Sequence, residues 1–162
     1  MKQLSSLSFG RKTLVVGLPL VIIVLIDQYT KHLASSALES GPLSLIPAVL
    51  QLKLSHNNSL AFGLFFNKWL IAGLIMIALI LLIATYVTSF SQKTMLSLVA
   101  LGMILGGAVG NIIDRIRVGH VVDFIDIVFW SIFNVADIAI VAGLIILLVE
   151  SFISSPNIQE KK

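Results

Sequence analysis

The stretch TMLSLVALGMILGGAVGNII, from Thr94 to Ile113, holds 20 residues without a charge and decides the fold class. A helix that crosses a lipid bilayer needs about 20 mostly apolar residues. A second uncharged run, of 24 residues, lies between Lys68 and Lys93. Both runs therefore predict helices that span a membrane.

Two weaker signals complete the predicted bundle. The residues between Lys12 and Asp27 are uncharged, and the polar residues that follow can extend that helix into the membrane interface. Near the C-terminus, Asp137 is the only charge between Asp126 and Glu150. We therefore expect an all-α membrane fold, a single domain over residues 1–162 with four transmembrane helices at about 13–34, 69–90, 94–114 and 130–153.

The composition excludes several classes of protein. Hydrophobic residues make up 57% and charged residues 12%, whereas globular chains average about half and about a quarter. A mean hydropathy of +1.03 is too high for a soluble enzyme or a disordered segment. The absence of cysteine excludes disulfides, thiolate metal sites and a cysteine nucleophile. The net charge of +3 is scattered, so we expect membrane lipid and not nucleic acid as a partner.

The basic residues predict the orientation of the chain. Arg11 and Lys12 precede the first helix, which favours a cytoplasmic N-terminus, and an even number of spans returns the C-terminus to the same side. A cleavable signal peptide is the alternative, but Asp27 and Lys31 interrupt the required pattern. The loop at about 35–68 is then extracytoplasmic, and its apolar and polar residues alternate over Leu50–Ser55, which predicts a small β segment between helices one and two.

Glycines on the third predicted helix indicate close packing. Gly102, Gly106 and Gly110 recur every four residues and form a ridge that lets another backbone approach. Ala139 and Gly143 have the same spacing on the fourth helix. We expect these two helices to pack against each other.

Polar residues gather at the predicted outer ends of the helices, in three groups: Asp27 with Lys31, Asn111 with Asp114 and Arg115, and Asp123 with Asn134 and Asp137. Ionisable residues are costly in a membrane and usually mark function. Two carboxylates that share a proton supply the base and the acid that hydrolysis by an activated water needs. Alternatively, Asp27 pairs with Lys31 and Asp114 with Arg115 only to fix the helix ends.

Neither a metal nor a cofactor is expected. His32, His56 and His120 lack the spacing of metal ligands, and none lies beside a suitable serine.

Five segments resemble the motif series of the lipoprotein signal peptidase (signal peptidase II) family: DQYTK at 27–31, HNNSLAFG at 56–63, GGAVGNIIDR at 106–115, VVDF at 121–124 and FNVAD at 133–137. The resemblance implies an aspartic endopeptidase of the bacterial cytoplasmic membrane, with its active site near the outer face. It implies cleavage of prolipoproteins just before the cysteine that carries a diacylglyceryl group. The catalytic pair corresponds to Asp123 and Asp137. The residues expected to line or brace the site are Asp27, Lys31, Asn57, Asn111, Asp114, Arg115 and Asn134.

Four positions depart from the family pattern: Ser59, Leu60, Ser131 and Ile138. They leave open a catalytically inactive relative that acts as a binding protein. A proton-coupled membrane carrier is the other alternative, although the acids crowd one end and the inner half offers no polar path. We expect the chain to act as a monomer.

Overall fold

The computed structural model describes residues 8–57 and 94–154. Within these residues the chain forms three helices and four strands. They are α1 (Phe9–Ala37), β1 (Leu43–Ile46), β2 (Leu50–Asn57), α3 (Met95–Arg117), β3 (Val121–Ile127), β4 (Ile132–Phe133) and α4 (Val135–Ser154). The helix expected at 69–90 lies outside the described residues.

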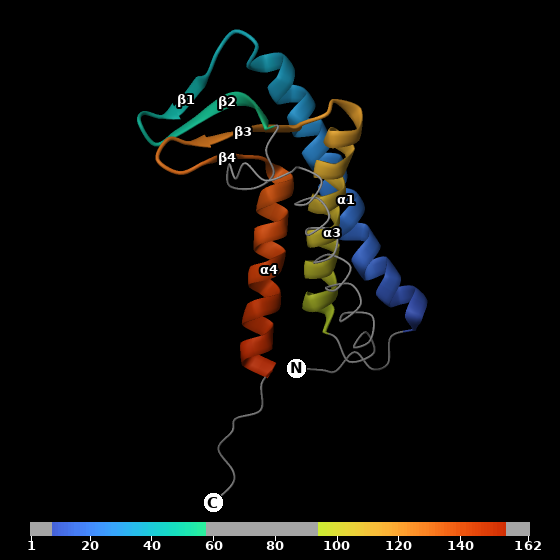
Figure 1. Ribbon diagram of the computed structural model, residues 1–162. Helices are drawn as coiled ribbons and strands as arrows, with labels where there is room; N and C mark the ends of the chain where they lie inside the picture. The colour runs from blue at the N-terminus through green and yellow to red at the C-terminus, as the bar shows by residue number, and fades with distance from the viewer. Residues whose placement is uncertain (1–7, 58–93, 155–162) are drawn as a thin grey trace, which may run out of the picture.

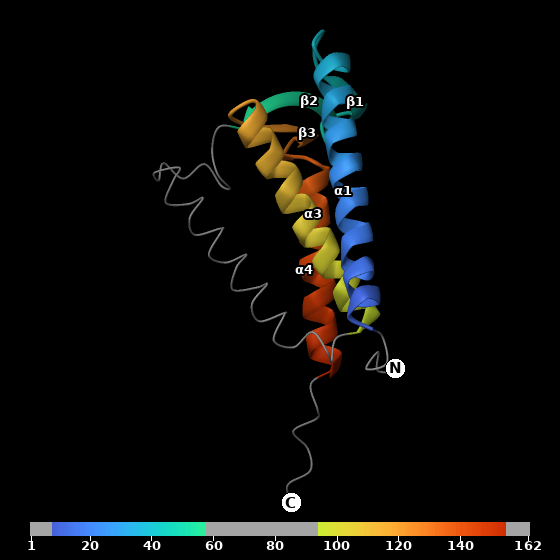
Figure 2. The ribbon, with the colours of Figure 1, turned by 90° about the vertical axis from the view of Figure 1, so that its right-hand side faces the viewer.

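The described helices run side by side, and the sheet lies at one end of them (Figure 1). Helices α1 and α3 are each long and apolar enough to cross a membrane. The start of α1 and the end of α4 lie together at the end opposite the sheet (Figure 1). Helix α3 packs against both α1 and α4, and Figure 2 shows it inclined between them.

Helix α4 begins at Val135, later than the expected start near 130. The residues before it are extended, because Ile132 and Phe133 pair with Asp126 and Ile125 of β3. As a result Asp137 lies in the first turn of α4 instead of more than a turn inside the helix.

The strands form one antiparallel sheet in the order β1-β2-β3-β4. Strand β2 confirms the strand that was predicted from the alternation at Leu50–Ser55. The expectation that β structure is confined to the loop after the first helix is wrong, because β3 and β4 come from the segment between α3 and α4. Phe124 of β3 packs with Ala34 and Leu38 at the end of α1, which seats the sheet on the helices.

The glycine ridge of α3 faces α1, not α4 as expected. A Cβ atom built on Gly106 would lie 2.8 Å from the carbonyl oxygen of Leu20, and one on Gly102 would collide with the carbonyl oxygen of Val16. Helices α3 and α4 do touch, but through other glycines. A Cβ on Gly143 would lie 2.7 Å from the carbonyl oxygen of Ala100, and one on Gly107 would collide with the carbonyl oxygen of Ala136 in α4.

Substitution of Gly106 tests this contact. Gly106→Leu should lower the thermal midpoint of the purified protein, because a side chain there meets the α1 backbone and overpacking costs about 1–3 kcal/mol or more. Gly17→Leu is the matched control, since a Cβ on Gly17 in α1 meets nothing within 4 Å. Equal thermal midpoints for the two variants would contradict the packing described here.

Candidate active site

The first turn of α4 is capped by side chains. The Oδ1 of Asn134 accepts a hydrogen bond from the backbone N–H of Asp137 at 3.0 Å, and Oδ2 of Asp137 accepts one from the N–H of Asn134 at 3.3 Å. This reciprocal arrangement is a capping box. The N–H of Ala136 donates to Oδ1 of Asp27 on α1 at 2.9 Å. The positive end of the helix dipole therefore faces two carboxylates, Asp27 and Asp137, whose negative charge it stabilises.

Lys31 is the centre of a buried ion cluster. Its Nζ lies 2.8 Å from Oδ2 of Asp27 and 2.7 Å from Oδ2 of Asp114, and all three side chains are buried. The expected pairing of Asp27 with Lys31 is confirmed. The expected pairing of Asp114 with Arg115 is wrong, since the ion pair of Asp114 is with Lys31 and Arg115 donates to the backbone oxygen of Asn111.

Asp114 also binds the backbone at the start of β3. Its Oδ2 accepts a hydrogen bond from the backbone N–H of Val122 at 3.1 Å, and its Oδ1 accepts one from Nε2 of Gln28 at 2.9 Å. Gln28 reaches Oδ2 of Asp27 as well, at 3.3 Å. Gln28 was not among the site residues predicted from the sequence, although it stands next to Asp27 in the motif DQYTK.

Asp123 enters the site from β3. Its side chain is 2% exposed, and it accepts hydrogen bonds from Asn57 at 2.9 Å and from Asn134 at 2.7 Å. Burial raises the pKa of the Asp123 carboxyl above its ordinary value, and the hydrogen bond from Asn57 opposes that rise. The negative charge of Asp137 raises the same pKa further. The protonated form of Asp123 is therefore favoured more than in water.

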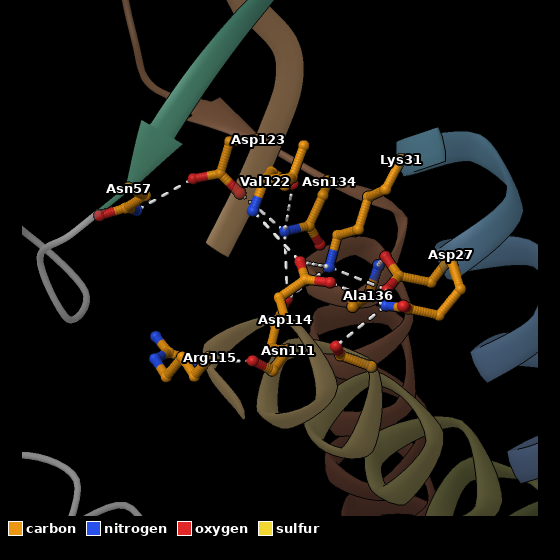
Figure 3. A network of polar contacts seen from close by, with 12 residues as sticks. Asp27, Lys31, Asn57, Asn111, Asp114, Arg115, Val122, Asp123, Asn134 and Ala136 are labelled. Carbon is orange, nitrogen blue, oxygen red and sulfur yellow. Dashed lines mark hydrogen bonds and ion pairs between the residues drawn. The ribbon is translucent and has the colours of Figure 1, made fainter. Parts of the chain in front are cut away.

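Asp137 is only partly buried, and two asparagines connect it to Asp123. Its Oδ1 accepts a hydrogen bond from Nδ2 of Asn111 at 2.9 Å, and the Oδ1 of Asn111 accepts one from Nδ2 of Asn134 at 3.1 Å. Because Asn134 also donates to Asp123, the two acids share one network of amide donors. Figure 3 shows Asn111, Asn134 and Asp123 of this network. The guanidinium of Arg115 interacts electrostatically with both carboxylates.

The nine predicted site residues thus come together at the sheet end of the helices, from α1, β2, α3, β3 and α4. All of them except Asp137 are labelled in Figure 3. Their arrangement provides two neighbouring carboxylates in different surroundings, which is what general acid and general base catalysis requires. The described residues contain no group of three or more His, Cys, Asp or Glu side chains that could hold a metal ion.

Comparison with known proteins identifies the family. The family described as signal peptidase (SPase) II matches residues 20–153. The chain belongs to this family.

Individual relatives agree with that assignment. The lipoprotein signal peptidase of Moorella thermoacetica is 39% identical over 129 residues, which cover 78% of this chain and 85% of the relative. The one from Caldanaerobacter subterraneus is 40% identical over 127 residues, 77% of this chain and 87% of the relative. A solved structure described as a bacterial membrane enzyme superposes with a TM-score of 0.75 at 28% identity, covering 95% of this chain and 94% of that chain. The chain is therefore a membrane-bound peptidase.

The departures from the family pattern lie at exposed positions or outside the described residues. Ile138 is 48% exposed, and Ser131 lies at the exposed turn before β4, where its hydroxyl donates to the backbone oxygen of Ile132. Ser59 and Leu60 fall among the residues that the structure does not describe.

A second polar group lies at the other end of the helices. The buried carboxylate of Glu150 accepts hydrogen bonds from the hydroxyls of Thr94 and Ser97 at the start of α3. The inner half therefore holds a polar group of its own. The residues of α4 between the two groups, from Ile138 to Val149, are all apolar or glycine, so α4 offers no polar path between the ends.

Asp114 should matter for stability. Asp114→Asn should lower the thermal midpoint together with the activity, because an amide leaves the Lys31 ammonium with one carboxylate fewer and cannot accept at both of its ends. Removing one partner of a buried ion pair costs about 3–5 kcal/mol. Thermal unfolding in detergent measures this effect. A stable but inactive Asp114→Asn variant would place Asp114 in the chemistry instead.

Proposed function

We propose that this chain is an aspartic endopeptidase that removes the signal peptide from diacylglyceryl-modified bacterial prolipoproteins, by cleaving before the lipidated cysteine. The chemistry is supported by one observation above the others: two carboxylates with different surroundings share a network of amide donors at one end of a membrane protein. The family and the names of the relatives support the substrate.

Asp123 and Asp137 are the proposed catalytic pair, and their surroundings distinguish their roles. Asp137 sits at the positive end of α4, accepts two N–H donors and is partly exposed, so it is the carboxylate that takes a proton from water. Asp123 is buried and its pKa is raised, so it starts as the carboxylic acid.

The reaction then follows as two steps. Asp137 removes a proton from the water as the water oxygen attacks the carbonyl carbon, while the Asp123 acid donates its proton to the carbonyl oxygen. In the second step the C–N bond breaks, and the proton held by Asp137 passes to the nitrogen of the departing cysteine. The proton returns from the former carbonyl oxygen to Asp123, which leaves a carboxylic acid product and the starting enzyme.

The proposal also covers the cellular location and membrane topology of the chain. The chain is a multi-pass protein of the bacterial cytoplasmic membrane with four transmembrane helices, both termini in the cytoplasm, and the sheet and active site near the outer face. Arg11 and Lys12 before α1 support this orientation. It acts as a monomer, without metal or cofactor, on the prolipoprotein in contact with membrane lipid and not with nucleic acid.

The two alternatives fit the site less well. A proton-coupled carrier needs a polar path, and the apolar stretch of α4 from Ile138 to Val149 does not provide one along that helix. An inactive relative requires a damaged site, whereas Asp123 and Asp137 both have their hydrogen-bond donors in place.

Asparagine substitutions test the catalytic pair. Asp123→Asn and Asp137→Asn should each lower turnover of a lipidated prolipoprotein by about 10²- to 10⁴-fold or more, because each removes one acid/base group. Asp137→Asn should also lower the thermal midpoint slightly, since a charged cap at the first turn of α4 is worth about 1 kcal/mol.

Asp126→Asn is the matched control. Asp126 lies on the same strand as Asp123, is also buried and accepts a hydrogen bond from Gln51 at 2.7 Å, but it makes no described contact with the catalytic pair. The Asp126→Asn variant should therefore keep the turnover of the unchanged protein. The mobility shift of the cleaved substrate measures all three variants, and near-normal cleavage by Asp123→Asn or Asp137→Asn would refute the proposed function.

A further inference from the structure

The amide of Asn111 stands between a cation and a catalytic acid. Its Oδ1 accepts hydrogen bonds from Nζ of Lys31 at 3.0 Å and from Nδ2 of Asn134 at 3.1 Å. Its Nδ2 donates to Oδ1 of Asp137 at 2.9 Å. The reverse orientation would place the NH₂ group against two donors and the amide oxygen against a carboxylate. The charge and donors around Asn111 therefore allow only one orientation of its amide.

We propose that Lys31 is a positioning residue for Asp137, which acts by fixing the Asn111 amide so that its N–H points at the carboxylate. This inference rests on the proposed function, in which Asp137 is the base. Lys31 is only 3% exposed, so its ammonium has no access to a bound substrate. Its hydrogen-bonded connection to Asp137 passes through Asn111.

The position of Asp137 is sensitive to this contact. Each oxygen of its carboxylate accepts one N–H, from Asn111 on α3 and from the backbone of Asn134. The bond from Asn134 is local to α4, whereas the bond from Asn111 sets the carboxylate relative to α3. A base that is displaced by about 1 Å loses on the order of a hundredfold in rate. Loss of the Asn111 donor therefore affects turnover more than substrate binding.

Lys31 also has a second role that the test must separate from the first. It neutralises Asp27 and Asp114, so its removal leaves two buried carboxylates without their cation and lowers stability. Gln28 serves as the control for this effect, because it donates to both of those acids and makes no described contact with Asn111. Gln28→Leu should lower the thermal midpoint without changing how the kcat losses of the Lys31 and Asn111 variants combine.

A double-mutant cycle of Lys31→Met and Asn111→Leu tests the proposal. Each single variant should lower kcat by roughly 10- to 100-fold, the effect of one hydrogen bond to a charged group, with little change in KM. The double variant should be no slower than the slower single variant, because both changes remove the same contact with Asp137. Independent effects, in which the losses in kcat multiply, would overturn the proposal, and so would a normal kcat in Lys31→Met.

Two further variants keep the test decisive. If Lys31→Met does not fold, the double variant Lys31→Met/Asp114→Asn replaces it, because this pair of changes restores the net charge of the buried cluster. Its kcat is compared with that of Asp114→Asn alone and should again be roughly 10- to 100-fold lower. Equal kcat values for these two variants would overturn the proposal. Asp137→Asn separates the two claims. An active Asp137→Asn variant contradicts the proposed function. If Asp137→Asn is inactive but the kcat losses of Lys31→Met and Asn111→Leu multiply in the double variant, only the role of Lys31 is contradicted.

Discussion

The ammonium of Lys31 between the carboxylates of Asp27 and Asp114 is the interaction on which the rest of the structure depends. Charges are costly to bury, and they stay buried only when they are paired and their remaining hydrogen-bonding positions are filled. Those positions are filled by the backbone N–H of Ala136 at the start of α4 and that of Val122 at the start of β3. One ion cluster thereby ties together three helices and the sheet.

The fold places two aspartate side chains, Asp123 and Asp137, in different surroundings. Asp137 is held at the positive end of a helix, partly exposed, whereas Asp123 is carried into a buried position by a strand. On the proposed function these surroundings separate the base from the acid without any metal ligand. The asparagines at 111 and 134 keep the pair in register, because their amides donate to the acids from α3 and from the cap of α4. Segments that are separate in the sequence thus contribute the donors, and tertiary packing brings them together.

The sequence predicted α3 directly, since the absence of charge over 20 residues has a direct physical meaning in a bilayer. Helix α1 was predicted from a shorter uncharged run, between Lys12 and Asp27, with polar residues that extend it. The sequence also predicted β2, because an alternating strand shows its two faces in its own residues. Strand β3 shows no such alternation: its residues Val121–Phe124 are all buried, and only pairing with β2 reveals it. The start of α4 was misplaced for a related reason, because the apolar residues before Asn134 fit a helix and a strand equally well.

Partners across the fold were harder to predict than the elements themselves. The spacing of Gly102, Gly106 and Gly110 identifies a face that accepts a close neighbour but not which helix that neighbour is. Likewise, Asp114 stands next to Arg115 in the chain and yet pairs with Lys31 of another helix, because adjacent residues on a helix point in different directions. The catalytic pair itself came from the resemblance to a family, and the hydrogen-bond network around the two acids supports it.

The central claim is that one carboxylate works ionised while the other works protonated, and the pH dependence of kcat/KM tests it most directly. The mechanism needs one ionised carboxylate as the base and one carboxylic acid as the proton donor, so kcat/KM falls at low pH, where no ionised base remains, and at high pH, where Asp123 has lost the proton that it must donate. Because burial raises the pKa of Asp123, its active protonated form persists to higher pH than that of an ordinary aspartate. The account therefore predicts a bell-shaped profile for cleavage of a lipidated prolipoprotein. A profile that rises in a single step and stays level at high pH would contradict it.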